Sequence, residues 1–230
     1  MNQLVTTGII LARTDYGEAD RILTLLTPEY GKLRLLAKGV RRVKSKLAGG
    51  IELFSVSELT FIRGRGEIGT LVSSRLKQHF SHIVQDLDRT MLGYELIRQL
   101  NKITEDEAEA EYFELLQQAF EALDDTGVPL ELVSFWYAAQ LLRLGGHTPN
   151  LQTDDTGVLL DDAQTYNFSP ERMSFTPAPA SKQGRFAANH IKFLRFAFAG
   201  NTPHTLARVR REEWFLAELT TLVNSMLAAR

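Results

Sequence analysis

Hydrophobic and polar residues alternate along several short segments in the first third of the chain. The clearest segment is 31–38, where apolar residues alternate with Lys32, Arg34 and Lys38. A period of two is typical of a β-strand with one buried face, and here the other face is cationic. The same reasoning predicts five strands, at about residues 4–13, 20–26, 31–38, 54–62 and 68–77.

Turn-forming residues separate these segments, notably at 14–17, 27–31 and 64–66. A longer connection, 39–53, joins the third predicted strand to the fourth. Five short strands in about 80 residues, with one long connection, are typical of a small closed barrel such as the OB-fold. We therefore predict an OB-fold domain over residues 1–79, a kind of domain that often holds single-stranded nucleic acid.

After Phe80 the apolar residues recur at steps of three and four, which predicts helices and an overall α+β fold. The predicted helical features are a helix of about 20 residues from about Ile83, a second helix with its N-cap at Thr104, helices over 129–144 and 182–198, a helix start at Thr202–Pro203, and a last helix over 212–228. Residues 147–180 are polar and rich in turns. They predict a loose hairpin inserted into a helical domain of residues 80–230.

The charge of the chain is unevenly distributed. The net charge is −2, but residues 1–79 carry +6, residues 80–170 carry −13 and residues 171–230 carry +5. Phosphates respond to the local potential within about 10 Å, so the segments matter more than the total. There is no cysteine, no signal-peptide pattern and no apolar run of membrane-spanning length, which together fit a cytoplasmic protein without disulfides or thiolate metal sites.

The connection after the third strand contains a dense run of positive charge, RRVKSK at 41–46. A cationic strand that leads into such a run suits contact with a polyanionic backbone, although most charge runs are simply solvated surface loops. The candidate DNA-binding residues are Lys32, Arg34, Lys38, Arg41, Arg42, Lys44, Lys46, Arg63 and Arg65. The few aromatic residues of the barrel lead us to expect contact with the backbone rather than stacking with bases.

The C-terminal region offers a second candidate site, in which cations accompany aromatic residues. An acidic peptide with a hydrophobic end would need such a pairing. The candidate residues for binding a partner's tail are Lys192, Arg195, Arg208, Arg211, Phe196 and Trp214. The alternative is that the aromatic residues pack in the core and the cations are solvated.

Signals of enzymatic activity are weak. The five histidines show no metal-ligand spacing, and the doublets Asp154–Asp155 and Asp161–Asp162 fit hairpin turns better than a cation site. The Gly64–Gly66 stretch is too short for a phosphate-binding loop. We therefore predict a protein that is not an enzyme and needs no cofactor or metal. A divalent-metal nuclease is kept as the alternative that incubation with DNA and Mg²⁺ would test.

The N-terminal segment 8–56 resembles the N-terminal domain of the bacterial RecO family. The resemblance rests on short blocks in a fixed order: Gly8-Ile9-Ile10-Leu11, Tyr16-Gly17-Glu18-Ala19-Asp20-Arg21, Leu25-Leu26-Thr27-Pro28, Gly31-Lys32-Leu33 and Ala37-Lys38-Gly39-Val40-Arg41-Arg42, with Ser45 and Leu47. Over the rest of the chain it is limited to the order of helices and hairpin.

The resemblance implies a recombination mediator with an N-terminal OB domain and a helical C-terminal domain. Such a protein binds single- and double-stranded DNA, anneals complementary strands and works near the nucleoid. The implied partners are RecR, the acidic tail of the single-stranded DNA-binding protein and, indirectly, RecA. Many members carry four zinc-binding cysteines in the inserted hairpin, whereas residues 147–180 contain none. The alternative is an OB-fold adaptor that binds RNA or protein without annealing.

Overall fold

A computed structural model describes residues 2–45, 47–64, 66–104, 109–179, 181–210 and 213–229. The chain forms two compact units, residues 1–126 and 127–230. The first contains the predicted barrel and the helices that follow it directly, and the second contains further helices and the inserted segment. The domain boundary predicted near residue 80 falls inside the first unit.

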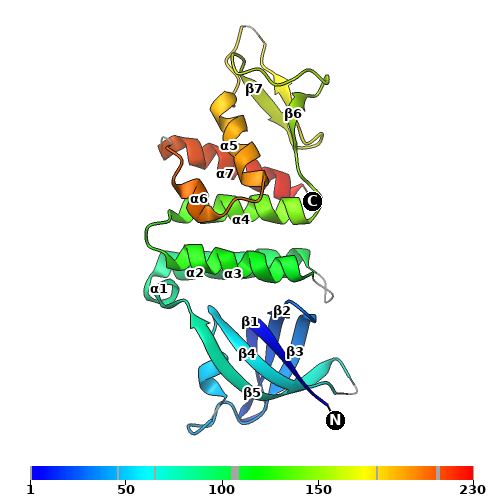
Figure 1. Ribbon diagram of the computed structural model, residues 1–230, viewed down its shortest axis with the longest axis vertical. Coiled ribbons are helices and arrows are strands. Elements are labelled where there is room, and N and C mark those ends of the chain that lie inside the picture. The colour runs from blue at the N-terminus through cyan, green and yellow to red at the C-terminus, as the bar shows by residue number, and fades with distance from the viewer. Residues whose placement is uncertain are drawn as a thin grey trace. The chain divides into compact units, whose positions relative to one another are not determined.

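The five predicted strands are present and form a closed barrel, as expected for an OB-fold (Figure 1). They are β1 (Gln3–Tyr16), β2 (Asp20–Thr27), β3 (Gly31–Ala37), β4 (Ser55–Ile62) and β5 (Ile68–His79), in the order β1-β2-β3-β5-β4. Antiparallel pairing of β1 with β4 closes the barrel, while β3 and β5 run parallel.

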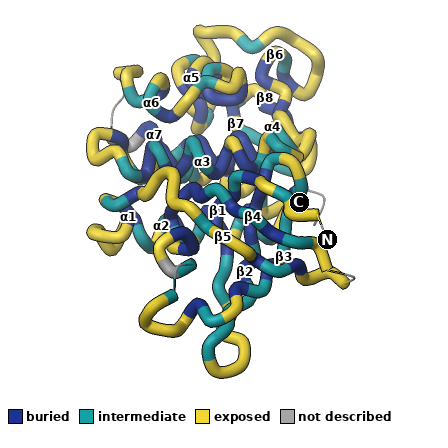
Figure 2. The backbone as a smooth tube through the Cα atoms, turned by 60° about the horizontal axis from the view of Figure 1, so that its bottom comes forward, coloured by how far each residue is buried: buried dark blue, intermediate teal, exposed yellow. Residues whose placement is uncertain are grey.

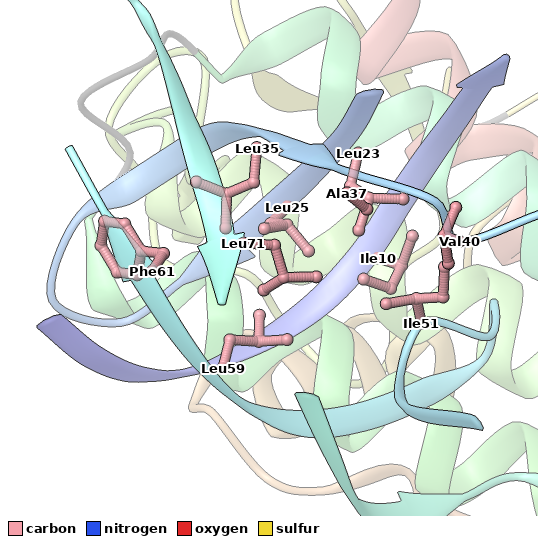
Figure 3. Packing of buried hydrophobic residues seen from close by; sticks show 10 residues of the cluster. All are labelled: Ile10, Leu23, Leu25, Leu35, Ala37, Val40, Ile51, Leu59, Phe61 and Leu71. Atoms are coloured by element: carbon pink, nitrogen blue, oxygen red, sulfur yellow. The ribbon is translucent and has the colours of Figure 1, made fainter. Parts of the chain in front are cut away.

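The barrel core consists of aliphatic side chains from every strand, together with Phe61. Figure 3 shows ten of these residues: Ile10, Leu23, Leu25, Leu35, Ala37, Val40, Ile51, Leu59, Phe61 and Leu71. Leu35 and Ala37 are buried whereas Arg34 is exposed, so the alternation predicted for β3 is confirmed. Val40 and Ile51 belong to the connection after β3, which therefore contributes to the core at both of its ends.

Three helices complete the first unit: α1 (Ser81–Gln85), α2 (Leu87–Ile103) and α3 (Ala110–Asp124). The sequence predicted one helix where α1 and α2 lie. The chain breaks at Asp86, whose carboxylate accepts a hydrogen bond from the backbone N–H of Arg89 at 3.0 Å and caps α2.

The predicted N-cap of the next helix was wrong. Thr104 ends α2, and its hydroxyl donates to the carbonyl of Leu100 at 2.7 Å, so the side chain points back into the helix that precedes it. Residues 105–108, which the capping prediction also used, lie outside the described residues. The N-cap of α3 is Glu109, whose side chain makes no capping hydrogen bond.

Phe54 connects the barrel to these helices. It is buried, has a positive φ of 54°, and its ring packs edge-on against Tyr94 of α2 and Phe120 of α3, with ring centroids 5.3 and 5.4 Å apart. Gly93 lies directly over the same ring. A Cβ atom at that position would sit 2.5 Å from Cε1 of Phe54, so the close approach requires glycine.

The second unit contains α4 (Leu130–Leu144), α5 (Ala188–Phe198), α6 (Pro203–Ala207) and α7 (Glu213–Ala228). The predicted helix over 182–198 begins only at Ala188. The backbone groups of the preceding segment are used elsewhere, because Phe186 and Tyr166 exchange two backbone hydrogen bonds of 2.8 Å. The predicted helix start at Thr202–Pro203 is confirmed, with the Thr202 hydroxyl accepting from the N–H of Thr205.

The inserted segment forms a three-stranded sheet instead of a loose hairpin. Its strands are β6 (Asn150–Asp154), β7 (Tyr166–Ser169) and β8 (Ser174–Pro177), in the order β6-β8-β7, and only β7 and β8 form the expected antiparallel pair. Phe175 is at the centre of the insert, with Tyr166, Phe168 and Phe186 packed edge-on around its ring. An aromatic cluster therefore stabilises this sheet.

None of the helices in the described ranges combines the length and the hydrophobicity that crossing a bilayer requires.

The contact between Gly93 and Phe54 predicts that Gly93→Ala destabilises the first unit. Alanine gains about 1 kcal/mol of helix propensity, but the added methyl overlaps a buried ring, at a cost of about 1–3 kcal/mol. We expect a lower midpoint in urea unfolding followed by circular dichroism. Met91→Ala, on the exposed side of the same helix, is the control and should change the midpoint little. A higher midpoint for Gly93→Ala than for the wild type would contradict this contact, because only the gain in helix propensity would then remain.

Candidate nucleic-acid interface

The candidate DNA-binding residues that the structure describes lie in two groups along β3. Lys32 near its start and Arg34 at its middle lie beside the β4–β5 connection that carries Arg63. Lys38 follows its end and leads into the run of charge. Lys38 is six positions after Lys32, which along an extended strand is a distance of about 20 Å. Lys46 and Arg65 lie outside the described residues.

At the end of β3 the chain forms a double turn, residues 38–45, which carries most of the basic run. The backbone N–H of Arg42 donates to the carbonyl of Gly39 at 3.1 Å, and that of Ser45 donates to the carbonyl of Arg42 at 3.0 Å. Arg41, Arg42, Val43 and Lys44 are all exposed, and Figure 2 shows in yellow that several connections between the barrel strands are exposed. The expected loop is therefore a hydrogen-bonded structure that presents its side chains to solvent.

The double turn is fixed to the β1–β2 hairpin. The N–H of Gly39 donates to the Asp20 carboxylate at 2.7 Å, and the N–H of Arg41 donates to the carbonyl of Ala19 at 2.9 Å. Gly39 has a φ of +64°, which favours glycine at this position. After the turn, the Ser74 hydroxyl of β5 donates to the carbonyl of Leu47 at 3.0 Å. This hydrogen bond fixes the segment that follows the double turn to β5.

Several cations at this end of the barrel are already paired with carboxylates. Asp15 lies 2.7 Å from Arg21 and 3.6 Å from Arg41, and the hydrogen bond from Arg21 is the main reason that the pKa of Asp15 is lowered. Arg13 pairs with Glu52 at 2.8 Å. These pairs are exposed and contribute little to stability, but they neutralise part of the local charge.

Lys38, Arg42 and Lys44 differ from these residues. Each is exposed, and no carboxylate within the described part of the chain forms an ion pair with any of them. Glu18, exposed in the neighbouring hairpin turn, reduces the surplus of positive charge at this end. The uncompensated cations therefore belong to the double turn itself.

The structure also brings basic residues to this end that the sequence reasoning missed. Arg13 lies on β1 and Arg21 lies on β2, in the β1–β2 hairpin. Arg21 is opposite Ala37, the last residue of β3. Arg75 lies on the part of β5 that continues past the end of β3, next to Ser74. Each is isolated in the sequence. Correct pairing of the strands was the signal that could have found them.

The cations at the start of β3 have partners. The Lys32 ammonium donates to the carbonyls of Thr104 at 2.7 Å and Asn101 at 3.3 Å, at the C-terminal end of α2. Arg34 lies 3.9 Å from Glu67, and the Arg63 guanidinium lies 5.0 Å from the centre of the Tyr30 ring. Lys32 thus supplies a positive charge to the negative end of a helix dipole.

In the second unit, α5 brings two of the candidate residues for tail binding next to the insert. Lys192 pairs with Asp162, and the Arg195 guanidinium donates to the carbonyl of Leu151 at 2.7 Å. Arg208 is exposed at the end of α6, a separate element. Phe196 is half-buried. Arg211 and the side chain of Trp214 lie outside the described parts.

Arg195 lines a groove of about 820 Å³ between the insert and the end of α5. Its walls are mainly apolar and include Leu151, Leu159, Leu160 and Phe198. Leu159 is 73% exposed and has room for an apolar contact. The groove therefore combines one cation with an apolar lining.

Several other residues of the second unit have structural roles. Phe193 and Phe215 are buried and pack against each other, with ring centroids 5.5 Å apart, so they belong to the core. The Asp154 carboxylate accepts hydrogen bonds from Thr156 and from the N–H of Val158, which lowers its pKa and fixes a turn. Among the described residues, no cluster of three or more histidine or carboxylate side chains is arranged to hold a metal ion.

Comparisons with known proteins give a consistent result. The family model described as Recombination protein O N terminal matches residues 1–80, and the one described as Recombination protein O C terminal matches residues 84–230. A DNA repair protein RecO from Dehalococcoides mccartyi strain 195 is 32% identical over 230 residues, covering 96% of this chain and 87% of that protein.

Other relatives carry the same name. The DNA repair protein RecO of Dehalococcoides mccartyi strain CBDB1 is 36% identical over 225 residues, covering 96% of this chain and 87% of its own. That of Roseiflexus sp. strain RS-1 is 35% identical over 167 residues, covering 72% of this chain and 58% of its own.

The position of Lys32 predicts a structural effect of its substitution. Lys32→Met removes the charge from the end of α2 and leaves two carbonyls without their donor, so we expect the free energy of unfolding to fall by about 1–2 kcal/mol. Lys38→Met, just past the end of the same strand and without a carboxylate partner among the described residues, should change it by less than about 0.5 kcal/mol. Urea unfolding measures both. A Lys32→Met protein of unchanged stability that binds DNA more weakly would show that Lys32 acts on DNA instead.

Proposed function

Since the chain belongs to the RecO family of DNA repair proteins, we propose that it binds single- and double-stranded DNA at the basic end of its barrel. There it would anneal complementary strands and help to load the recombinase during recombinational repair. One observation carries the proposal. The double turn is hydrogen-bonded to the β1–β2 hairpin, and it exposes Lys38, Arg42 and Lys44, which have no carboxylate partner among the described residues.

The two groups of cations suggest a path for the strand. The double turn would bind phosphates first, with Arg41 and Lys46 as further contacts. The exposed Arg34, midway along β3, would lead the strand toward Arg63 and Arg65. We keep residues 1–79 as the DNA-binding domain. If about six phosphates are neutralised on a single strand, the logarithm of affinity should fall with the logarithm of salt concentration at a slope near −4.

Annealing requires that two phosphate backbones approach each other while their bases stay available. Cations on a projecting turn lower the repulsion between the strands and leave the base edges uncovered. A deep trough lined by aromatic residues would instead hold the bases against the protein. In the described part of the barrel Phe54 and Phe61 are buried and Tyr30 packs against Phe61, so these rings do not line such a trough.

Annealing of complementary fluorophore- and quencher-labelled oligonucleotides tests this function. We expect the wild type to accelerate annealing, and Arg42→Ala with Lys44→Ala to reduce the acceleration at least about tenfold, because both uncompensated charges at the tip are lost. Arg98→Ala with Lys102→Ala, on α2, removes the same charge and should change little. Failure of the wild type to accelerate annealing would instead favour an adaptor that binds RNA or protein.

We further propose that this protein works with RecR and, indirectly, RecA in the cytoplasm, near the nucleoid. It would also bind the acidic tail of the single-stranded DNA-binding protein in its second unit. The groove beside Arg195 supports the last point, since it combines a cation with apolar walls that suit a peptide with an acidic stretch and a hydrophobic end. Lys192, Arg208 and Arg211 would add positive charge around it.

Titration with a synthetic tail peptide tests this site. We expect saturable binding in the micromolar range that weakens at least about fivefold in Arg195→Ala, because the charge nearest the apolar walls is lost. Lys182→Ala, an exposed cation outside the groove lining, is the matched control. Thermal unfolding should show that both variants stay folded. Absence of binding by the wild type would remove the site.

A further inference from the structure

Val43 is an apolar side chain at the tip of the double turn, between two cations. Its side chain is fully exposed, with a relative exposure of 104%. It is the second residue of the turn that the hydrogen bond from Ser45 to Arg42 closes. Gly, Pro, Asn, Asp and Ser dominate turns, so an exposed valine is uncommon there. Covering an apolar group that is exposed to water with a ligand lowers the free energy.

The backbone that carries Val43 is fixed in place. The hydrogen bond from the N–H of Arg42 to the carbonyl of Gly39 closes the preceding turn. Further hydrogen bonds join that turn to Ala19 and Asp20 of the β1–β2 hairpin. A side chain held in this way loses little conformational freedom when it makes a contact. The valine is therefore presented to a ligand rather than left to move freely on a long loop.

An aromatic side chain is exposed on the neighbouring hairpin. Tyr16 is the last residue of β1, is 55% exposed and pairs across the hairpin with Asp20, whose carboxylate receives the N–H of Gly39. The exposed aromatic and apolar residues thus lie on two turns that are bonded to each other. Aromatic rings are platforms on which unpaired bases stack, largely without sequence preference.

The positive charges that flank Val43 determine which part of a bound DNA strand lies near it. Arg42 and Lys44, on either side of Val43, suit phosphates, so a strand held by both would have its bases close to the valine. In a duplex the bases are paired and stacked, and an apolar wedge has to separate them at a cost. In a single strand the bases are already accessible.

We infer that Val43 and Tyr16 contact the unpaired bases of a single strand bound at this end of the barrel, so that the bases add to the affinity that the phosphates supply. The inference rests on the proposed binding of DNA at this end and adds to it a contact beyond the phosphates. It also differs from the expectation, drawn from the sequence, that the backbone would dominate binding.

Fluorescence anisotropy of the full chain with two labelled strands of equal length tests the inference. One strand is oligo(dT), and the other has the same phosphates but abasic sugars. We expect the wild type to bind oligo(dT) about tenfold more tightly, since stacking on one side chain contributes that order of affinity per base. Val43→Ser with Tyr16→Ser should reduce the preference to less than about twofold, with an unchanged slope of affinity against salt.

Matched variants separate the possible results. Val5→Ser changes a valine that is 59% exposed near the opposite end of β1 and should keep the preference, as should Tyr16→Phe. Arg42→Ala with Lys44→Ala should weaken binding to both strands equally and make the slope less steep by about 1.4. Equal wild-type affinity for the two strands would overturn the base contact and leave the proposed function intact. No binding to either strand would overturn both.

Discussion

The parallel pairing of β3 with β5 is the constraint on which the rest of the first unit depends. It spans three residue pairs, from Arg34 opposite Ile68 to Leu36 opposite Thr70, and it is tight enough that a Cβ at Gly69 would lie 2.9 Å from Leu35 and from the Ile62 carbonyl. Parallel neighbours cannot be joined by a short turn. The chain must therefore cross the end of the barrel before it returns as β4, and this crossing carries the basic residues.

The electrostatics of that crossing follow from its anchoring. Asp20 is committed to a backbone N–H, while Asp15 and Glu52 neutralise arginines of the strands and of the start of the turn. Asp15 and Asp20 thus bind the first residues of the double turn. The positive charges of Arg42 and Lys44, later in the turn, have no carboxylate partner among the described residues. The contacts that hold the double turn in place therefore also decide which of its positive charges remain without a carboxylate partner among the described residues.

The sequence predicted the barrel well because alternation along β3 and the other strands is a local property, as are the turns between them. It failed where a tertiary contact decides local structure. Phe186 is hydrogen-bonded to Tyr166, so α5 begins only after it, and Thr104 ends α2 although its capping pattern predicted that it would begin the next helix. The candidate interface was found only as a run of like charges. The pairing of Arg21 and the commitment of Lys32 to a helix end depend on residues distant in the sequence.

The aromatic cluster of the insert has a consequence for the conditions in which this protein can act. The strands around Phe175 are held by ring packing, in a chain that contains no cysteine. Zinc removal and thiol oxidation therefore have no thiolate here to act on. The contacts that hold this sheet together are apolar ring contacts, which neither condition removes.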